Sequence, residues 1–291
     1  MTQFIANGIF AASIYALVGT GFALIYRTCH FFHFAHGVIC TLGAYCAYFA
    51  SRQIGLPFAV AIVCSLVFSC LVGVFIEVFI YRRLRATGAS AEMLLLASLG
   101  VYIVGQNIIS MIFGDETRVL QSSGLSAGIN FAGIWMTRTQ VAVVILSIII
   151  LIALSALLKM TKMGLLLRAV ANDLELARVC GIDVDQVMIA AFALGSLLAG
   201  LAGILVGLDI NMVPAMGMRM LFMAVVAVIV GGKESFVGVS LGAILIGLVQ
   251  HLGVWKLSTR WQDTIVFAVL IIFLLVRPQG FLGRPLRRRT I

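Results

Sequence analysis

The sequence predicts an all-α polytopic membrane protein with about eight or nine transmembrane helices, because its composition and its apolar runs both fit the bilayer. Of the 291 residues, 62% are hydrophobic and 11% are charged, whereas a soluble domain carries about 25% charged residues. The mean hydropathy is +1.15. Apolar runs of about 20 residues recur, each long enough to cross a bilayer core of about 30 Å. We therefore expect residues 1–291 to form a single transmembrane domain.

Nine apolar runs give the predicted spans. The first follows Met1-Thr2-Gln3, which has no basic n-region and no cleavage pattern, so we interpret it as a retained helix. In the seventh, only residues 220–230 are uninterrupted and apolar, short of the roughly 17 that a crossing needs. That run is expected either to cross with Arg219 at its outer end or to be a broken helix. The predicted spans are 4–26, 29–50, 57–80, 92–114, 139–159, 187–208, 216–232, 235–253 and 263–276.

The positive charges predict how these spans are oriented. If each span crosses once, most of the 20 Lys and Arg residues share one face, and the positive-inside rule assigns that face to the cytoplasm. The N-terminus is then outside, the C-terminus inside, the charged segment 160–186 cytoplasmic and the loop 115–138 outside. That loop either docks an extracytoplasmic partner or simply connects two spans. Since the basic residues lie at span ends and in short loops, the net charge of +9 predicts no nucleic-acid partner.

Several motifs of enzymes are missing from the sequence. It contains no G-x-x-x-x-G-K-[ST] phosphate loop, no H-E-x-x-H and no G-x-S-x-G. The six cysteines lie mostly in apolar runs without paired spacing, so no disulfide framework is expected. The one embedded acid, Glu77, is interpreted first as a partner of Arg82 and Arg83 and only second as a coupling-ion site. An intramembrane enzyme is therefore a poor fit.

The segment 160–186 is the longest charged stretch between apolar runs. Asn172 followed by Glu175 resembles a capping box, and Gly181 fits the left-handed residue that closes a helix. A second helical piece is expected over Leu165–Val170. Two short helices would form a knob for a soluble partner, whereas one amphipathic helix would rest on the inner leaflet. Periodicity alone favours neither.

Three histidines begin the second predicted span, at His30, His33 and His36. In a helix, the i, i+3, i+6 spacing would place them within about 120° of its surface, so a metal site is conceivable. No C-x-x-C or H-E-x-x-H accompanies them, and we expect no metal. They belong either to an interfacial belt with the neighbouring Phe residues or, for His33 and His36, to a polar path through the bundle.

Glycines recur at four-residue spacing in the later spans. Gly203 and Gly207 form one G-x-x-x-G and Gly238 and Gly242 another, a pattern that lets helices pack closely. The stretch 231–235 (G-G-K-E-S) is expected to be either a helix break that aims backbone dipoles at a substrate or, more simply, a turn.

Taken together, these motifs resemble those of permease subunits of the branched-chain amino acid class of ABC importers. The motifs, in chain order over nearly the whole sequence, are His33-Phe34-Ala35-His36-Gly37, Glu77 with Tyr81-Arg82-Arg83-Leu84-Arg85, Met163-Gly164 with Arg168-Ala169 and Gly181-Ile182, Gly231-Gly232 with Ser235, and Arg277-Pro278-Gln279-Gly280-Phe281. His33 stands where the family usually has Asn, Arg83 where it has Pro, and Glu234 where it has Gly. The first departure leaves the substrate open.

The resemblance implies a division of labour in the bacterial inner membrane. This multi-pass chain and a homologous second permease would form the pathway in the lipid bilayer, and an extracytoplasmic solute-binding protein would deliver substrate. Two cytoplasmic ATP-binding subunits would bind ATP and Mg, so this chain would need no cofactor and would not be an enzyme. The residues implied in coupling to the ATPases are Gly164, Arg168, Ala169, Asn172, Asp173, Ala177, Gly181, Ile182 and Asp183.

A zwitterion crossing bare hydrocarbon would lose its hydration, so a path needs polar groups among small residues. Path candidates are His33, Phe34, His36, Gly37, Tyr102, Gln106 and Asn107, with Ser13, Tyr15 and Ser98 as further polar candidates. Hydrogen bonding between helices explains the polar ones equally well. The expected substrates are branched-chain or related amino acids, with urea or short amides as the alternative. From other classes, a self-sufficient secondary transporter or channel, or a structural or sensory subunit, remains open.

Overall fold

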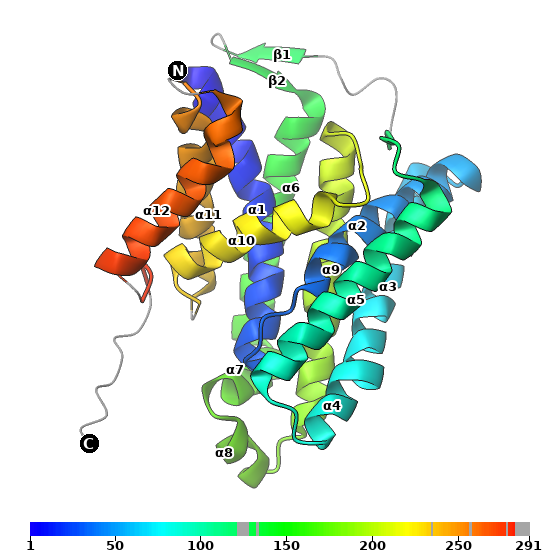
Figure 1. Cartoon of the computed structure of the whole chain (residues 1–291), viewed down its shortest axis with the longest axis vertical. Helices are drawn as coiled ribbons and strands as arrows, with labels where there is room; N and C mark the ends of the chain where they lie inside the picture. Colours follow the sequence, from blue (N-terminus) through cyan, green and yellow to red (C-terminus); the bar gives the residue numbers. More distant parts are fainter. Residues whose placement is uncertain (121–127, 132–133, 234, 256–257, 278, 283–291) are drawn as a thin grey trace.

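The structure is a computed structural model that describes residues 1–120, 128–131, 134–233, 235–255, 258–277 and 279–282. Glu234, Lys256 and the arginines from Arg284 onward, which entered the charge and motif analysis, lie outside the described residues. The chain forms a helical bundle with one small hairpin (Figure 1). The elements are α1 (Thr2–Cys29), α2 (Ala35–Tyr48), η1 (Phe49–Gln53), α3 (Phe58–Ile76), η2 (Glu77–Tyr81), α4 (Arg82–Ala86), α5 (Ala91–Phe113), β1 (Gly128–Phe131), β2 (Ile134–Thr137), α6 (Arg138–Met160), α7 (Lys162–Asn172), α8 (Leu174–Val179), α9 (Val184–Asp209), α10 (Met216–Gly231), α11 (Phe236–Gly253), η3 (Thr259–Trp261) and α12 (Gln262–Val276).

Seven helices of the described chain are long and apolar enough to cross a membrane, and α10 is a shorter apolar helix. This confirms the predicted class of a polytopic helical membrane protein. At 1.5 Å per residue, the 16 residues of α10 extend about 24 Å, less than the hydrocarbon core of about 30 Å. The 14 residues of α2 continue directly into η1, so α10 is the helix that differs in kind from the seven long ones.

α1 and α9 form the centre of the bundle. α1 packs along α9, α10 and α11, while α9 packs on α2 and α3. The predicted close packing through glycine is confirmed, because a Cβ on Gly203 would collide with the backbone of Cys40 in α2, and one on Gly242 with the backbone of Ala227 in α10. Backbones in direct contact hold α2 and α10 tightly within the bundle.

α10 runs obliquely across the bundle, not along it (Figure 1). The segment 210–215 before it is not helical and pairs with Arg118, whose N–H donates to the Met212 carbonyl at 2.9 Å. These features favour the broken-helix alternative for the seventh predicted span. At its other end, Gly232 adopts a φ of 96° and Ser235 caps α11 through the Gly238 N–H. The described residues of the G-G-K-E-S stretch, Gly231–Lys233 and Ser235, therefore lie where α10 ends and α11 begins.

The predicted helix from residue 29 does not begin there. α1 ends at Cys29, His30 takes the left-handed conformation with a φ of 58°, and α2 starts only at Ala35. Between the two helices, the Ser98 hydroxyl of α5 accepts from the Phe34 N–H and lies 3.1 Å from the Phe32 carbonyl. These contacts from another helix hold the backbone out of a helix, so the expected i, i+3, i+6 histidine face is wrong.

A β-hairpin lies within the predicted loop 115–138, part of which falls outside the described residues. β1 pairs antiparallel with β2, with Gly128 opposite Thr137. The Gln3 side chain of α1 both donates to the Trp135 carbonyl and accepts from its N–H. Thr137 then forms a capping box with Gln140 that starts α6. The hairpin is thus anchored to the beginnings of both α1 and α6.

Candidate functional site

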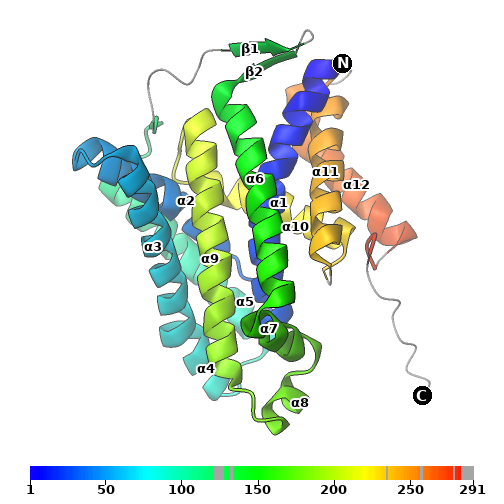
Figure 2. The ribbon, with the colours of Figure 1, turned by 180° about the vertical axis from the view of Figure 1, so that it is seen from behind.

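The predicted pair of short helices is present as α7 and α8, which protrude at the end of the bundle opposite the N-terminus (Figure 2). The capping residue is Asp173, which accepts from the Leu176 N–H at 2.9 Å. Asn172 is the last residue of α7, so the expected N-cap at Asn172 is wrong by one position. The reason is that Asp173, with a φ of −156°, is the extended residue between the helices, and a cap requires that conformation.

Both ends of this protrusion turn sharply. Thr161 caps α7 by accepting from the Gly164 N–H at 3.1 Å, and a Cβ on Gly164 would collide with the Leu158 carbonyl of α6. At the other end, Gly181 has the expected left-handed backbone, with a φ of 81°, and Asp183 caps α9 through the Gln186 N–H. α6 and α9 therefore lead directly into and out of the protrusion.

The residues implied in coupling fall into two groups by exposure. Gly164 and Ala177 are buried, and Ala169 and Ile182 are partly buried. The exposed ones are Arg168, Asn172, Asp173, Gly181 and Asp183. Two further apolar side chains at the tip, not predicted from the sequence, are exposed as well, Leu176 at 57% and Val179 at 84%. The sequence does indicate them, because Leu176 and Val179 lie within two residues of Arg178 in a charged segment, where a helix facing water would carry polar residues.

Two ion pairs lie near this region, one within the η2–α4 segment and one between α4 and α9. Glu77, fully buried, binds Arg85, whose Nη1 donates to Oε2 at 3.2 Å. The expected pairing of Glu77 with Arg82 and Arg83 is therefore wrong. Arg82 instead binds Asp185 at the start of α9 at 2.9 Å. The π-helical turn η2 between Glu77 and Tyr81 changes the directions of the side chains that follow it. A helical wheel drawn from the sequence assumes a regular α-helix, so it places the arginines wrongly relative to Glu77.

His33 and His36 are completely buried beside each other, with ring centroids 6.0 Å apart. His33 Nδ1 lies 3.1 Å from the Tyr81 hydroxyl, and His36 Nε2 lies 3.2 Å from the Val18 carbonyl. Their burial contradicts the interfacial-belt interpretation. The other ring nitrogen of each has no hydrogen-bond partner among the described residues. Within the same residues, no group of three or more His, Cys, Asp or Glu side chains is placed to hold a metal.

The remaining path candidates are only partly brought together. Phe34 packs against Phe222 of α10, with ring centroids 6.4 Å apart. Gly37 abuts the backbone of Gly217, also in α10. The histidines, Phe34 and Gly37 thus cluster where α2 and α10 begin. Asn107, by contrast, is exposed on α5 and donates to the Ile103 carbonyl of its own helix. On α5, Tyr102 is buried and Gln106 is partly exposed.

A polar network connects four helices, and most of its residues were not among the predicted path candidates. The Tyr15 hydroxyl of α1 donates to Gln250 of α11 at 2.7 Å, and Gln250 Nε2 donates to Asp263 of α12 at 3.4 Å. Arg219 of α10 binds the same Asp263 oxygen at 3.2 Å. Of these, only Tyr15 was a polar candidate from sequence. The sequence feature that could have predicted the network is the presence of Arg219 and Asp263, each at the start of an apolar run.

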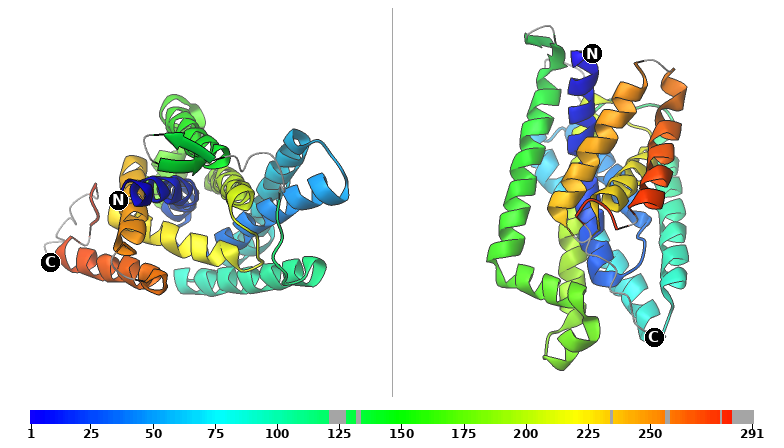
Figure 3. Two further views of the ribbon diagram at one scale, coloured as in Figure 1. Left: turned by 90° about the horizontal axis from the view of Figure 1, so that it is seen from above. Right: turned by 90° about the vertical axis from the view of Figure 1, so that its left-hand side faces the viewer.

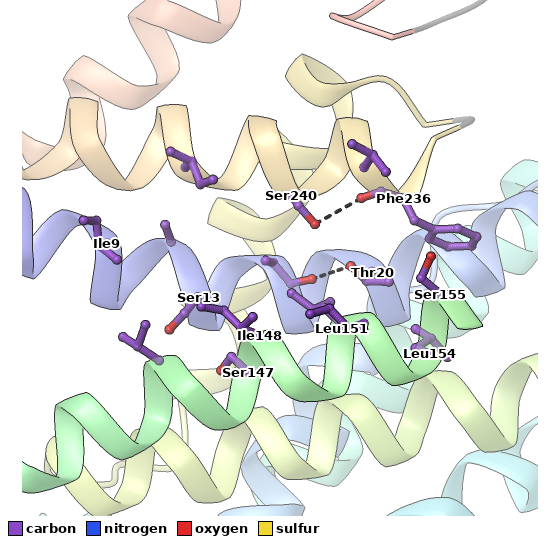
Figure 4. Close-up of a pocket in the computed structure, with 16 residues that line it drawn as sticks. Ile9, Ser13, Thr20, Ser147, Ile148, Leu151, Leu154, Ser155, Phe236 and Ser240 are labelled. Atoms are coloured by element: carbon purple, nitrogen blue, oxygen red, sulfur yellow. Dashed lines mark hydrogen bonds between the residues drawn. The ribbon is translucent and has the colours of Figure 1, made fainter. Parts of the chain in front are cut away.

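A cavity of about 370 Å³ lies between α1, α6 and α11 (Figure 4). Its wall is mostly apolar, and three of its hydroxyls donate to carbonyls of their own helices, namely Ser13, Thr20 and Ser240. Ser147 is buried there without a partner among the described residues. Of the path candidates, only Ser13 lines it. Such a wall offers little to compensate a dehydrated zwitterion, so this cavity is a poor candidate for the substrate path.

A bundle of long apolar helices, with an oblique short helix at its centre and a protrusion at one end, is the architecture of a polytopic membrane protein. Residues 4–274 match the family described as "Branched-chain amino acid transport system / permease component", and the chain belongs to that family. A member whose described residues include seven helices able to span the bilayer is a multi-pass protein of the inner membrane, and its family is not itself catalytic.

Similar proteins extend over nearly the whole chain. The high-affinity branched-chain amino acid transport system permease protein LivH of Escherichia coli K12 is 30% identical, over 96% of this chain and 94% of the relative. The corresponding protein BraD of Pseudomonas aeruginosa is 26% identical, over 97% and 96%. In structure, the chain resembles PsaBC from Streptococcus pneumoniae, with a TM-score of 0.52 at 13% identity, over 95% and 93% of the two chains. That last similarity concerns the fold alone.

Proposed function

We propose that this chain is the pathway-forming permease subunit of an ATP-driven importer for branched-chain or related amino acids. The observation that carries the proposal is the similarity to LivH and BraD over nearly the full length of all three chains. The partners are a homologous second permease, an extracytoplasmic solute-binding protein and two cytoplasmic ATP-binding subunits. Those last subunits hold the ATP and Mg. The N-terminus is outside and the C-terminus inside, which places α7 and α8 in the cytoplasm.

The α7–α8 protrusion is the element on which the ATP-binding subunits act. Its exposed tip combines apolar Leu176 and Val179 with charged Glu175 and Arg178, a mixture suited to a protein interface. α6 and α9 enter and leave it through capped, sharply turned ends, so a displacement of the protrusion moves both helices. α9 packs on α1, α2 and α3. Closure of the ATPase pair would therefore reach the centre of the bundle as a rigid-body movement.

The substrate path runs past the starts of α2 and α10. Broken helices at the centre of a transporter present backbone groups to the solute where intact helices cannot. Phe34 and Phe222 offer apolar surface there, and His33 and His36 offer ring nitrogens without partners among the described residues. An amino acid needs both kinds of contact, because its side chain is apolar while its backbone groups are charged.

The test begins with affinity purification of the tagged chain, co-expressed with its neighbouring genes, and measurement of the intact mass of the complex. A particle with a second permease and two ATP-binding subunits supports the proposal. Proteoliposomes of that particle, supplied with the solute-binding protein, are then expected to take up leucine only with ATP. A lone chain that moves solute without ATPases would instead favour a secondary transporter. Uptake of urea or short amides but not of leucine would favour that alternative substrate.

The coupling role is tested separately with Asp173→Arg, which replaces the α8 cap with a bulky cation. ATP-dependent leucine uptake is expected to fall strongly while the complex still reaches the membrane. Arg83→Gln, in α4 at the same end of the bundle (Figure 1), is a matched control, because Arg83 forms no ion pair with a described residue and contacts the Phe79 ring of the preceding turn. Full uptake by Asp173→Arg would refute the coupling assignment.

A further inference from the structure

The Arg219–Asp263 ion pair is an unusual feature of the membrane-spanning region. Arg219 lies two residues after Gly217, which abuts Gly37 at the start of α2, and Asp263 lies in the first turn of α12. The pair is continuous with the Tyr15–Gln250 hydrogen bond, and Tyr15 lies near the middle of α1. The pair is therefore anchored in the bundle and is not a contact between surface loops.

Both charged side chains are accessible even though Gln250 behind them is buried. The exposed fractions are 64% for the Arg219 side chain and 43% for that of Asp263, against 4% for Gln250. Charged side chains within membrane-spanning segments face a bundle interior or an aqueous cavity, because hydrocarbon cannot solvate them. Both residues lie in the first turn of their helices, and an accessible ion pair on this face is suited to line an aqueous solute pathway.

The rest of that face is apolar. Phe222, one turn after Arg219 and 41% exposed, lies on the same side of α10, and Val225 and Ile229 continue the partly exposed stripe. Seen from above, α12 and α5 lie along one edge of the molecule with α10 directly behind them (Figure 3). A charged pair is thus followed along α10 by an aromatic ring and aliphatic side chains.

The pair retains unused hydrogen-bonding capacity. Both hydrogen bonds that Asp263 accepts from the described residues go to Oδ1, which leaves Oδ2 available. Arg219 uses one of its guanidinium N–H groups in this contact, whereas the group carries five donors in a planar fork. A carboxylate can bind such a fork with two hydrogen bonds, and an ammonium group can donate to Oδ2.

We propose that Arg219 and Asp263 bind the carboxylate and the ammonium group of a zwitterionic amino acid, with its aliphatic side chain on Phe222. This inference deepens the proposed function and rests on it. The two opposite charges, the buried Gln250 that orients Asp263 and the adjoining aromatic ring together match the three parts of such a substrate. Urea and short amides, which carry neither charge, would gain little from this arrangement.

The experiment uses the complete transporter in proteoliposomes, with radiolabelled leucine on its solute-binding protein. Arg219→Gln and Asp263→Asn are each expected to reduce ATP-dependent uptake about tenfold or more, the effect of losing hydrogen bonds to a charged group. Arg219→Lys keeps the cation without the planar fork and is expected to retain intermediate uptake. Arg138→Gln, at another exposed arginine, in the first turn of α6, is the matched control and is expected to transport normally.

A purely structural ion pair predicts different results. The double variant Arg219→Asp with Asp263→Arg restores a pair but places the cation away from α10 and Phe222. If leucine binds as proposed, its uptake stays low, whereas uptake at the wild-type rate would overturn the inference. The intact mass and melting temperature of each complex verify that a loss is not caused by misfolding.

The two levels of the proposal fail differently. A wild-type complex, assembled with its binding protein, that takes up no leucine would refute the proposed function itself. Normal leucine uptake by wild type, by Arg219→Gln and by Asp263→Asn would refute only the assignment of the zwitterion site.

Discussion

Two helices start in the α7–α8 protrusion and two at the junction where α2 and α10 begin, yet the two pairs of helix starts are stabilised in opposite ways. In the protrusion each helix start is capped from within, by Thr161 for α7 and Asp173 for α8. At the junction the caps come from other helices. Ser98 of α5 accepts from the Phe34 N–H before α2, and Thr41 of α2 accepts from the Gly217 N–H in the first turn of α10.

This difference suits the two functions proposed for these regions. A self-capped protrusion keeps its shape while a soluble partner engages and moves it. At the junction, α2 depends on α5 and α10 depends on α2 for part of its start, so neither α2 nor α10 shifts without affecting its neighbour. Variants that remove one kind of contact at a time therefore test whether the protrusion and the junction are stabilised differently, from the largest expected effect to the smallest.

The largest effect is expected at the buried ion pair between the two regions. Arg85→Met leaves the Glu77 carboxylate buried without its partner, beside Tyr81, whose hydroxyl contacts His33. Removing one member of a buried pair costs about 3–5 kcal/mol. The purified chain is expected to lose most of its thermal stability in detergent, measured by its melting temperature. The double variant Glu77→Gln with Arg85→Met should recover much of it, and equal losses in both variants would contradict this explanation.

The second effect concerns backbone contact at the junction. A Cβ on Gly217 would collide with the Gly37 carbonyl, so Gly217→Ala is expected to destabilise the chain by about 1–3 kcal/mol, the usual cost of overpacking. Gly100→Ala, in α5, is the matched control because nothing lies within 4 Å of its added methyl group. It should be neutral or stabilising by up to about 1 kcal/mol. Similar melting temperatures for the two variants would show that the junction accommodates extra volume.

These contrasts also explain what the sequence could predict. The two helices of the protrusion follow from local residues, and the error at Asn172 is a single position because two adjacent residues are both good caps. The seven long spans follow from apolar length alone. The break at residues 30–34 does not follow, because it depends on Ser98, more than sixty residues away. Likewise the partner of Glu77 depends on a π-helical turn, and the Arg219–Asp263 pair joins helices that no local pattern relates.

The third prediction tests the cap that comes from a distance. Ser98→Ala removes the hydroxyl that accepts from the Phe34 N–H and lies beside the Phe32 carbonyl. The Phe34 N–H then loses its hydrogen-bond acceptor. The expected loss is about 1–3 kcal/mol, measured by melting in detergent. Leucine uptake should fall as well, since the start of α2 is no longer fixed. Ser98→Thr keeps the hydroxyl and serves as the control; if it behaves like Ser98→Ala, the loss comes from packing and not from the hydrogen bonds.

The smallest effect on stability is expected for the local cap. Asp173→Ala removes the bond to the Leu176 N–H, and losing such a cap costs about 1 kcal/mol. Because the cap acts only on α8, the melting temperature of the whole chain should hardly change, while hydrogen exchange at the α8 amides should accelerate by about fivefold. Asp173→Asn retains a capping oxygen and should exchange like wild type. Acceleration that extends into α2 or α10 would show that the protrusion and the junction unfold as one unit, and the distinction between them would not hold.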